Sequence, residues 1–109
     1  MSDQPNLSVD AQLAALVPRF LANRSADVGR IRAALAGGDF EAIRAAAHGM
    51  KGSGGGYGFP EISRLGAAME EGARRRDATA IVELVAGLEA CLARIEAERG
   101  HGQGGPDSA

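Results

Sequence analysis

The spacing of the apolar residues restricts the fold of this chain more than any other feature of its sequence. Apolar side chains recur at steps of three and four residues, which is typical of amphipathic helices, and no stretch alternates with the period of two expected for strands. The apolar 45% of the chain is dominated by alanine and leucine rather than β-branched or aromatic residues, so we expect an all-α protein. The first stripe contains Val9, Leu13, Leu16, Val17, Phe20, Leu21, Val28, Ile31 and Leu35.

Pro18 interrupts this first stripe. Proline has no backbone N–H and clashes with the preceding turn, so a helix interior tolerates it poorly, whereas a first turn accepts it. We therefore expect a short helix that ends near Leu16 and a second helix that begins at Pro18. A single long helix with a kink at the proline is the alternative.

Glycine, proline and aspartate mark the limits of the other helices. Three more helices are expected, over about 40–53, 60–73 and 78–99. Asp39 and Asp77 are suited to cap the first and the last of these, and Pro60 suits a first helical turn. The breaks between helices fall at Gly37 and Gly38, at the glycine run after Ser53, and at the segment RRRD.

The length of the chain, 109 residues, favours one domain. Because the connections are short, the economical fold is an antiparallel four-helix bundle, with the short extra N-terminal helix as a candidate lid. We expect the bundle to occupy residues 8–99. Residues 1–7 and the glycine-rich tail, residues 100–109, are expected to be disordered.

Charge and cysteine content exclude several functional classes. Twelve basic and 14 acidic residues leave a net charge of −2, so no overall field favours nucleic acid or an anionic membrane. Cys91 is the only cysteine, which excludes an internal disulfide and a cysteine-based zinc site, and its position in an apolar stripe predicts a buried hydrophobe. No stretch resembles a secretory signal or a membrane span. We expect a cytoplasmic protein without a metal or cofactor of its own.

His48 is expected on the outward face of the helix over 40–53. At about 100° per residue, it falls roughly 140° from the centre of the buried face. That face is formed by Phe40, Ile43, Ala47 and Met50. Residues three and four positions away share the face of the histidine. They are Arg44, Ala45, Lys51 and Gly52.

These neighbours suit His48 to chemistry with an anion. Arg44 and Lys51 would disfavour the protonated imidazole, which leaves the ring neutral and nucleophilic, and would also attract an anion brought to it. Ala45 and Gly52 would leave the ring open to a partner surface. A surface histidine without a role, and general acid–base catalysis by this residue alone, stay open as alternatives.

Other kinds of site lack the residues that they need. The second histidine, His101, lies in the tail, so a serine-type triad is excluded. No second histidine or cysteine lies at helical spacing from His48 to complete a metal site. The phosphate-loop motif GxxxxGK[ST] is absent, because Lys51 precedes the glycine run instead of following it.

The segment AAHGMKGSGGGYG resembles the signature of histidine-containing phosphotransfer (HPt) domains. In that signature a histidine is followed by a hydrophobe, by Lys-Gly-Ser, and by a glycine ten positions after the histidine. These positions are His48, Met50, Lys51, Gly52, Ser53 and Gly58. The resemblance covers roughly residues 10–97, including a downstream stripe of Leu65, Met69 and Glu70.

The resemblance implies a phosphorelay intermediate of two-component signalling rather than an enzyme. His48 would accept a phosphoryl group, usually on Nε2, from the aspartyl phosphate of one response-regulator receiver domain and pass it to another, with a hybrid sensor kinase as a further partner. Lys51 would balance phosphate charge, Gly52 would leave room for the receiver, and Mg²⁺ would be bound by the receiver. The docking rim would include Arg44, Ala45 and Ser53. We expect a monomer without nucleic-acid or membrane partners.

Two other functions compete with this interpretation. A helical adaptor would bind a receiver or kinase without accepting phosphate. A hydrolase or phosphohistidine phosphatase would use His48 as base or nucleophile, although an exposed helix face offers no pocket that excludes water. Within the resemblance, Tyr57 replaces a frequent aliphatic residue and Phe59 a frequent alanine, and both are expected to anchor the glycine loop on the bundle. Ser53 is expected to bond the helix backbone.

Overall fold

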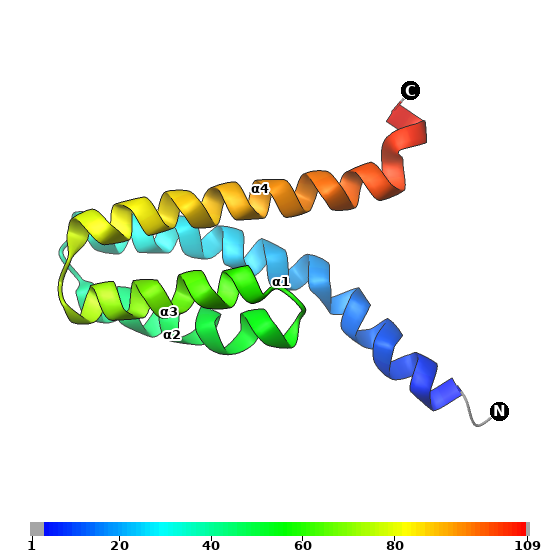
Figure 1. Ribbon diagram of the computed structural model, residues 1–109, viewed down its shortest axis with the longest axis horizontal. Helices are drawn as coiled ribbons and strands as arrows, with labels where there is room; N and C mark the ends of the chain where they lie inside the picture. The colour runs from blue at the N-terminus through cyan, green and yellow to red at the C-terminus, as the bar shows by residue number, and fades with distance from the viewer. Residues whose placement is uncertain (1–3, 109) are drawn as a thin grey trace.

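The computed structural model describes the backbone of residues 4–108 and the side chains of residues 11–100. It contains α1 (Gln4–Ala36), α2 (Phe40–Gly56), α3 (Pro60–Arg74) and α4 (Ala78–Ser108), with no strand in the described range. Figure 1 shows α2 and α3 as a short antiparallel hairpin beside the longer pair α1 and α4. The expected all-α four-helix bundle is confirmed.

The four helices form a closed ring around one apolar core. Each helix packs on its neighbours in sequence, and α4 closes the ring against α1, while the backbones of the diagonal pairs stay further apart over the described residues. Every helix contributes to the core, so none can bury its stripe alone. The largest fully buried side chains are Leu21, Ile31, Ile43, Met50, Ile62, Met69, Ile81, Val85, Leu88 and Cys91. The expectation of a buried Cys91 is confirmed, and burial raises the pKa of its thiol.

Pro18 lies inside α1, so the expected break between two N-terminal helices is wrong. Among residues 4–36 there is one continuous helix and no separate lid. An interior proline costs about 3 kcal/mol, yet burial of one large apolar side chain contributes about 1.5–3 kcal/mol. Val17, Phe20 and Leu21 are all buried next to the proline, whereas Pro18 itself is exposed. Packing on both sides of the exposed proline holds the helix together.

Two helices extend beyond their expected ends. α2 continues through the first glycines to Gly56 instead of ending at Ser53, and α4 reaches Ser108 instead of Arg99. Residues 1–3 and 109, and the side chains of 1–10 and 101–109, lie outside the described part of the chain. The expected domain limits, with disorder in residues 1–7 and 100–109, therefore stay a prediction.

The glycine run is helical at first because α2 packs closely on α3. A Cβ on buried Gly54 would lie 2.6 Å from the backbone nitrogen of Ser63, so only glycine permits this approach. The chain turns only afterwards, at Gly58, where φ is +90°. The glycine run thus combines a contact between two helices with a turn.

Aromatic side chains fasten this turn to α1. The ring of Phe20 stacks on Tyr57 with centroids 4.5 Å apart and on Phe59 with centroids 5.8 Å apart. Both turn residues pack against the core, which confirms the expected anchors. The capping predictions are confirmed as well, because Asp39 accepts a hydrogen bond from the N–H of Ala42 at 3.0 Å. Asp77 accepts the equivalent bond from Ala80 at 3.1 Å.

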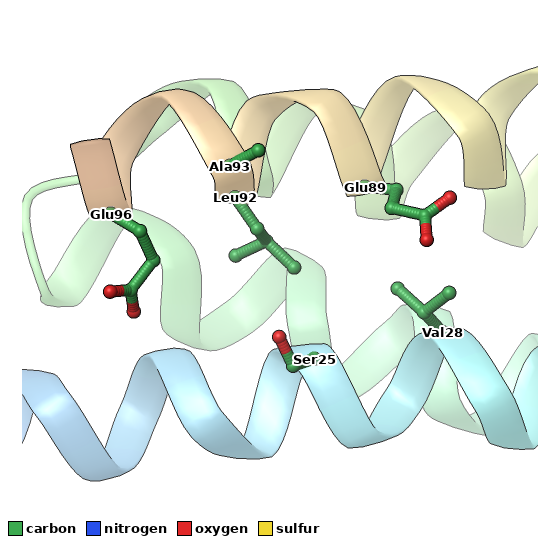
Figure 2. A pocket seen from close by; sticks show the side chains of 6 residues that line it. All are labelled: Ser25, Val28, Glu89, Leu92, Ala93 and Glu96. Atoms are coloured by element: carbon green, nitrogen blue, oxygen red, sulfur yellow. The ribbon is translucent and has the colours of Figure 1, made fainter.

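A groove of about 250 Å³ lies between α1 and α4. Figure 2 shows its apolar floor at Val28 and Leu92, with the carboxylates of Glu89 and Glu96 on the α4 side. No residue of α2 or α3 lines it, so the groove is separate from His48. Among the described residues, no helix combines the length and the apolar character that crossing a bilayer requires.

Candidate functional site

His48 lies in the middle of α2, with its side chain 64% exposed. The opposite face of the helix carries Ile43, Ala47 and Met50, which are completely buried. These three residues fix the rotation of α2 about its axis, because turning the helix would expose them. The imidazole therefore points outward, as the helical spacing predicts.

Glu70 on α3 holds one nitrogen of the imidazole. The Nδ1 atom of His48 lies 2.9 Å from Oε2 of Glu70. An ionised carboxylate can only accept hydrogen bonds, so Nδ1 must carry the proton and donate it. In the neutral ring, the lone pair is then on Nε2. Glu70 thus selects the tautomer in which the outer nitrogen is the nucleophile.

Lys51 and His48 keep Glu70 in its charged form, and Arg74 also contacts it. Glu70 is only 5% exposed, and its Oε1 lies 3.0 Å from Nζ of Lys51. Its Oε2 lies 3.3 Å from a guanidinium nitrogen of Arg74. The hydrogen bond from Lys51, followed by that from His48, holds the pKa of Glu70 below its ordinary value. A nearly buried carboxylate is tolerated here because three donors surround it.

The electrostatic surroundings of His48 include carboxylates that the prediction from α2 did not consider. Arg44 and Lys51 do lie within one turn of it, but neither presents a free positive charge to the ring. Arg44 is paired with Glu41 through hydrogen bonds of 2.6 and 3.1 Å, and Lys51 is paired with Glu70. The helical spacing of α2 contains no information on the carboxylate of Glu70, which comes from α3. That carboxylate is the charged group in contact with the imidazole.

The small residues around His48 leave its face open. A Cβ on Gly52 would meet no heavy atom within 4 Å, and Ala45 is exposed. Ser53 lies elsewhere, because its hydroxyl donates to the carbonyl of Gly49 at 3.0 Å and accepts a bond from Arg24 of α1 at 3.3 Å. The expected bond from Ser53 to the helix backbone is confirmed. The serine contributes to packing between α1 and α2, away from the imidazole.

Gly66 brings Glu70 to His48. A Cβ at Gly66 would lie 2.6 Å from the nitrogen of Lys51 and 2.9 Å from the carbonyl oxygen of Ala47. The absence of a side chain lets α3 lie directly on the backbone of α2 at the turn that carries His48. Glu70 is one turn further along α3, on the same side of that helix as Gly66. The close contact therefore places its carboxylate beside the imidazole.

Sequence reasoning missed the role of Glu70, although the residue belongs to the quoted downstream stripe. It lies 22 positions from His48, so no helical spacing relates the two. One feature of the sequence could have indicated a role for Glu70. It directly follows the buried Met69, on a helix whose other buried residues are apolar or glycine. Among the described residues, no three His, Cys, Asp or Glu side chains are grouped as they would be around a metal ion.

The comparison with protein families covers most of the bundle. A family model described as the Hpt domain matches residues 15–98. That range includes His48, Lys51 and Glu70 and leaves out only the outer ends of α1 and α4. No curated protein and no solved structure matches the chain. Because the family model spans more than half of the 109 residues, the chain belongs to the Hpt domain family.

Proposed function

We propose that this chain is a phosphorelay intermediate in which His48 receives a phosphoryl group from the aspartyl phosphate of one receiver domain and passes it to an aspartate of another. Hpt domains perform histidine phosphotransfer in phosphorelays and interact with receiver domains and kinases. The observation that supports His48 as the acceptor is its exposed imidazole, held at Nδ1 by Glu70. No other side chain in the described residues combines exposure, a nucleophilic atom and a fixed tautomer in this way.

The proposed transfer follows from this geometry. The lone pair of Nε2 attacks phosphorus, the bond from phosphorus to the aspartyl oxygen breaks, and the carboxylate of the receiver leaves with that electron pair. The imidazole keeps its proton on Nδ1 and becomes positively charged. Glu70, at 2.9 Å, stabilises that charge, so it favours the product of the first step without exchanging a proton. In the second step, a carboxylate oxygen of the next receiver attacks phosphorus, and Nε2 of His48 leaves with the electron pair of the bond from nitrogen to phosphorus.

This chain and the receiver each supply some of the other groups that the transfer needs. Lys51 can bind the incoming phosphate, because its side chain is 45% exposed and its Nζ lies 3.0 Å from Glu70, which also contacts the imidazole. The receiver supplies the acidic residues and the Mg²⁺ that orient the phosphoryl group, so this chain acts as a carrier without catalytic machinery of its own. The partners are response-regulator receivers and a hybrid sensor kinase, and we propose that a monomer acts with them in the cytoplasm.

Substitution of His48 tests the proposal directly. Incubation with a receiver labelled on its aspartate is expected to label the wild type with a bond that is stable in alkali and labile in acid, as a phosphoramidate linkage is. The His48→Gln variant should take no label while keeping its helical circular dichroism, since the side chain is exposed. Equal labelling of both proteins would exclude His48. Binding of a receiver by both proteins, without label on either, would support the adaptor instead.

Gly52→Gln probes whether the face around His48 docks the receiver. The new side chain has open space on this protein, so the fold is expected to be at least as stable, because glutamine favours a helix over glycine by up to about 1 kcal/mol. A receiver that must approach His48 closely would meet the added atoms, so transfer should slow about tenfold, equivalent to about 1.4 kcal/mol. Stopped-flow transfer kinetics measure this rate.

Gly29→Gln is the matched control for this change. Gly29 lies on the exposed side of α1, and its position is equally open. The same substitution there should leave the transfer rate within about twofold of the wild type, because isolated surface changes have small effects. If Gly52→Gln transferred as fast as Gly29→Gln, the receiver would not contact α2 at this position.

A further inference from the structure

Arg76 has an unusual backbone conformation in the connection between α3 and α4. Its φ is +56°, and among the described residues only glycines share a positive φ. Its N–H donates to the carbonyl of Ala73 at 3.0 Å, and the next N–H, of Asp77, donates to Gly72 at 2.9 Å. Helices often end in this way, and glycine is the usual residue at the left-handed position. The backbone at Arg76 therefore adopts a conformation that glycine would adopt at a lower local free energy.

The side chain of Arg76 lies over an aromatic ring at the edge of a pocket. Its guanidinium carbon is 4.8 Å from the ring centroid of Phe40 at the start of α2. The pocket is about 220 Å³ in volume. It is lined by Phe40, Glu41, Arg44, Ala73, Arg74 and Arg76. The attraction of the guanidinium to the face of the ring holds the side chain at the pocket and leaves its N–H groups available to bind.

Arg76 differs from its neighbours because its charge is not neutralised. Arg44 is paired with Glu41, and Arg74 is paired with Glu70 and Glu71. Arg75 lies within 4 Å of Glu71 and Asp77. The ion pairs of the described side chains include no carboxylate partner for Arg76. The pocket thus contains one preoriented guanidinium that can bind an anion from outside.

The pocket adjoins the site of His48. Arg44 lies one turn before His48 on α2, and Arg74 contacts the same oxygen of Glu70 that accepts the bond from the imidazole. A protein that covers His48 would therefore reach Arg76 at the edge of its footprint. Glu41, 74% exposed, forms the acidic part of this edge but is already held by Arg44.

We propose that Arg76, at the pocket that Arg44 and Arg74 also line, binds a carboxylate side chain on the surface of the receiver that docks over His48. This inference rests on the proposed function, since it assigns a second contact to the same partner. A carboxylate matches the planar fork of a guanidinium in a two-point contact. The contact would orient the receiver, so Arg76 is a docking residue and takes no part in the transfer of the phosphoryl group.

Arg76→Gly separates docking from folding. Glycine is favoured at a positive φ, so the thermal midpoint should equal or exceed that of the wild type. The dissociation constant for the unphosphorylated receiver is expected to rise about fivefold at low ionic strength, with a smaller change at high salt. Arg30→Gln is the charge-matched control, because Arg30 is 62% exposed on α1, and its dissociation constant should change less than about twofold.

The outcomes distinguish this inference from the proposed function. An unchanged dissociation constant for Arg76→Gly at low salt would overturn the docking role of Arg76, while label on His48 would still support the relay. A wild type that binds the receiver but takes no label would overturn the relay, and the fivefold change would still support the docking contact. A third outcome would assign the pocket to a small anion instead. In that case inorganic phosphate would shift the side-chain NMR signals of Arg76 in a saturable way, and Arg76→Gly would leave the affinity for the receiver unchanged.

Discussion

Gly66→Ala is expected to lower the free energy of unfolding by about 2 kcal/mol. The added Cβ would lie 2.6 Å from the nitrogen of Lys51 and 2.9 Å from the carbonyl oxygen of Ala47. Both are backbone atoms, so no side-chain rotation can relieve the contact and α3 must move away from α2. Overpacking against backbone atoms costs up to about 3 kcal/mol, and the helix propensity of alanine offsets about 1 kcal/mol of this, so the expected net loss is about 2 kcal/mol.

Urea denaturation or a thermal scan measures this loss, and Gly29→Ala is the matched control. Gly29 is an exposed glycine inside α1, and a Cβ there would meet no atom within 4 Å. The same change should stabilise the protein by up to about 1 kcal/mol through helix propensity alone. For a domain of this size, the thermal midpoint of Gly66→Ala should fall by about 10 °C, whereas that of Gly29→Ala should rise slightly. Equal midpoints would mean that α2 and α3 do not lie in contact at Gly66.

Glu70→Ala is expected to slow phosphoryl transfer by about 10- to 100-fold, equivalent to about 1.4–2.7 kcal/mol in the activation free energy. Without the carboxylate, the imidazole loses the acceptor that keeps the proton on Nδ1 and stabilises the charged ring after attack. Lys51 also loses the carboxylate that holds its Nζ at 3.0 Å in the wild type. Single-turnover transfer at saturating receiver measures the chemical step separately from docking.

Two comparisons separate positioning by Glu70 from a general effect on the fold. Glu61→Ala removes an acidic residue of the same helix and its 2.8 Å ion pair with Arg94, far from His48, and should leave the transfer rate unchanged. Glu70→Gln keeps an oxygen that can accept from Nδ1 but removes the charge. It should therefore recover part of the rate lost in Glu70→Ala. If the alanine variant transferred as fast as the wild type, the tautomer would be set by something other than Glu70.

The pH profile gives an independent readout of the same carboxylate. Lys51 and His48 hold the pKa of Glu70 below 4.5, so the charged form persists to lower pH than in an ordinary glutamate. A carboxyl group whose pKa is lowered by folding adds stability above its unfolded pKa, and this contribution is lost as the pH falls through the lower folded pKa. The stability of the wild type should decline in that acidic window more steeply than that of Glu70→Gln.

The core residues and the outward face of α2 could be predicted because they depend on local geometry. Ile43, Ala47 and Met50 share a face at any position in any helical bundle, so their apolar character alone turns His48 outward. The caps at Asp39 and Asp77 are local for the same reason, since a side-chain oxygen bonds an N–H three residues away.

The ends of helices were less predictable because burial competed with local preference. Proline and glycine both disfavour a helix, and both predictions of an early break rested on that preference. Pro18 stays inside α1 because its apolar neighbours are buried, and Gly54 stays inside α2 because its missing side chain lets α3 approach. In each case a contact with another helix outweighed the intrinsic propensity of the residue.

By itself, then, the sequence determined the helical class, the outward histidine and the resemblance in the residues around it, since each of these depends on spacing within one helix. The tertiary structure alone decided which charge faces the imidazole. Glu70 lies 22 residues from His48 and meets it only because Gly66 lets two helices touch at their backbones. Such a contact depends on how the faces of two helices pack against each other. The spacing of residues within either helix does not predict that packing.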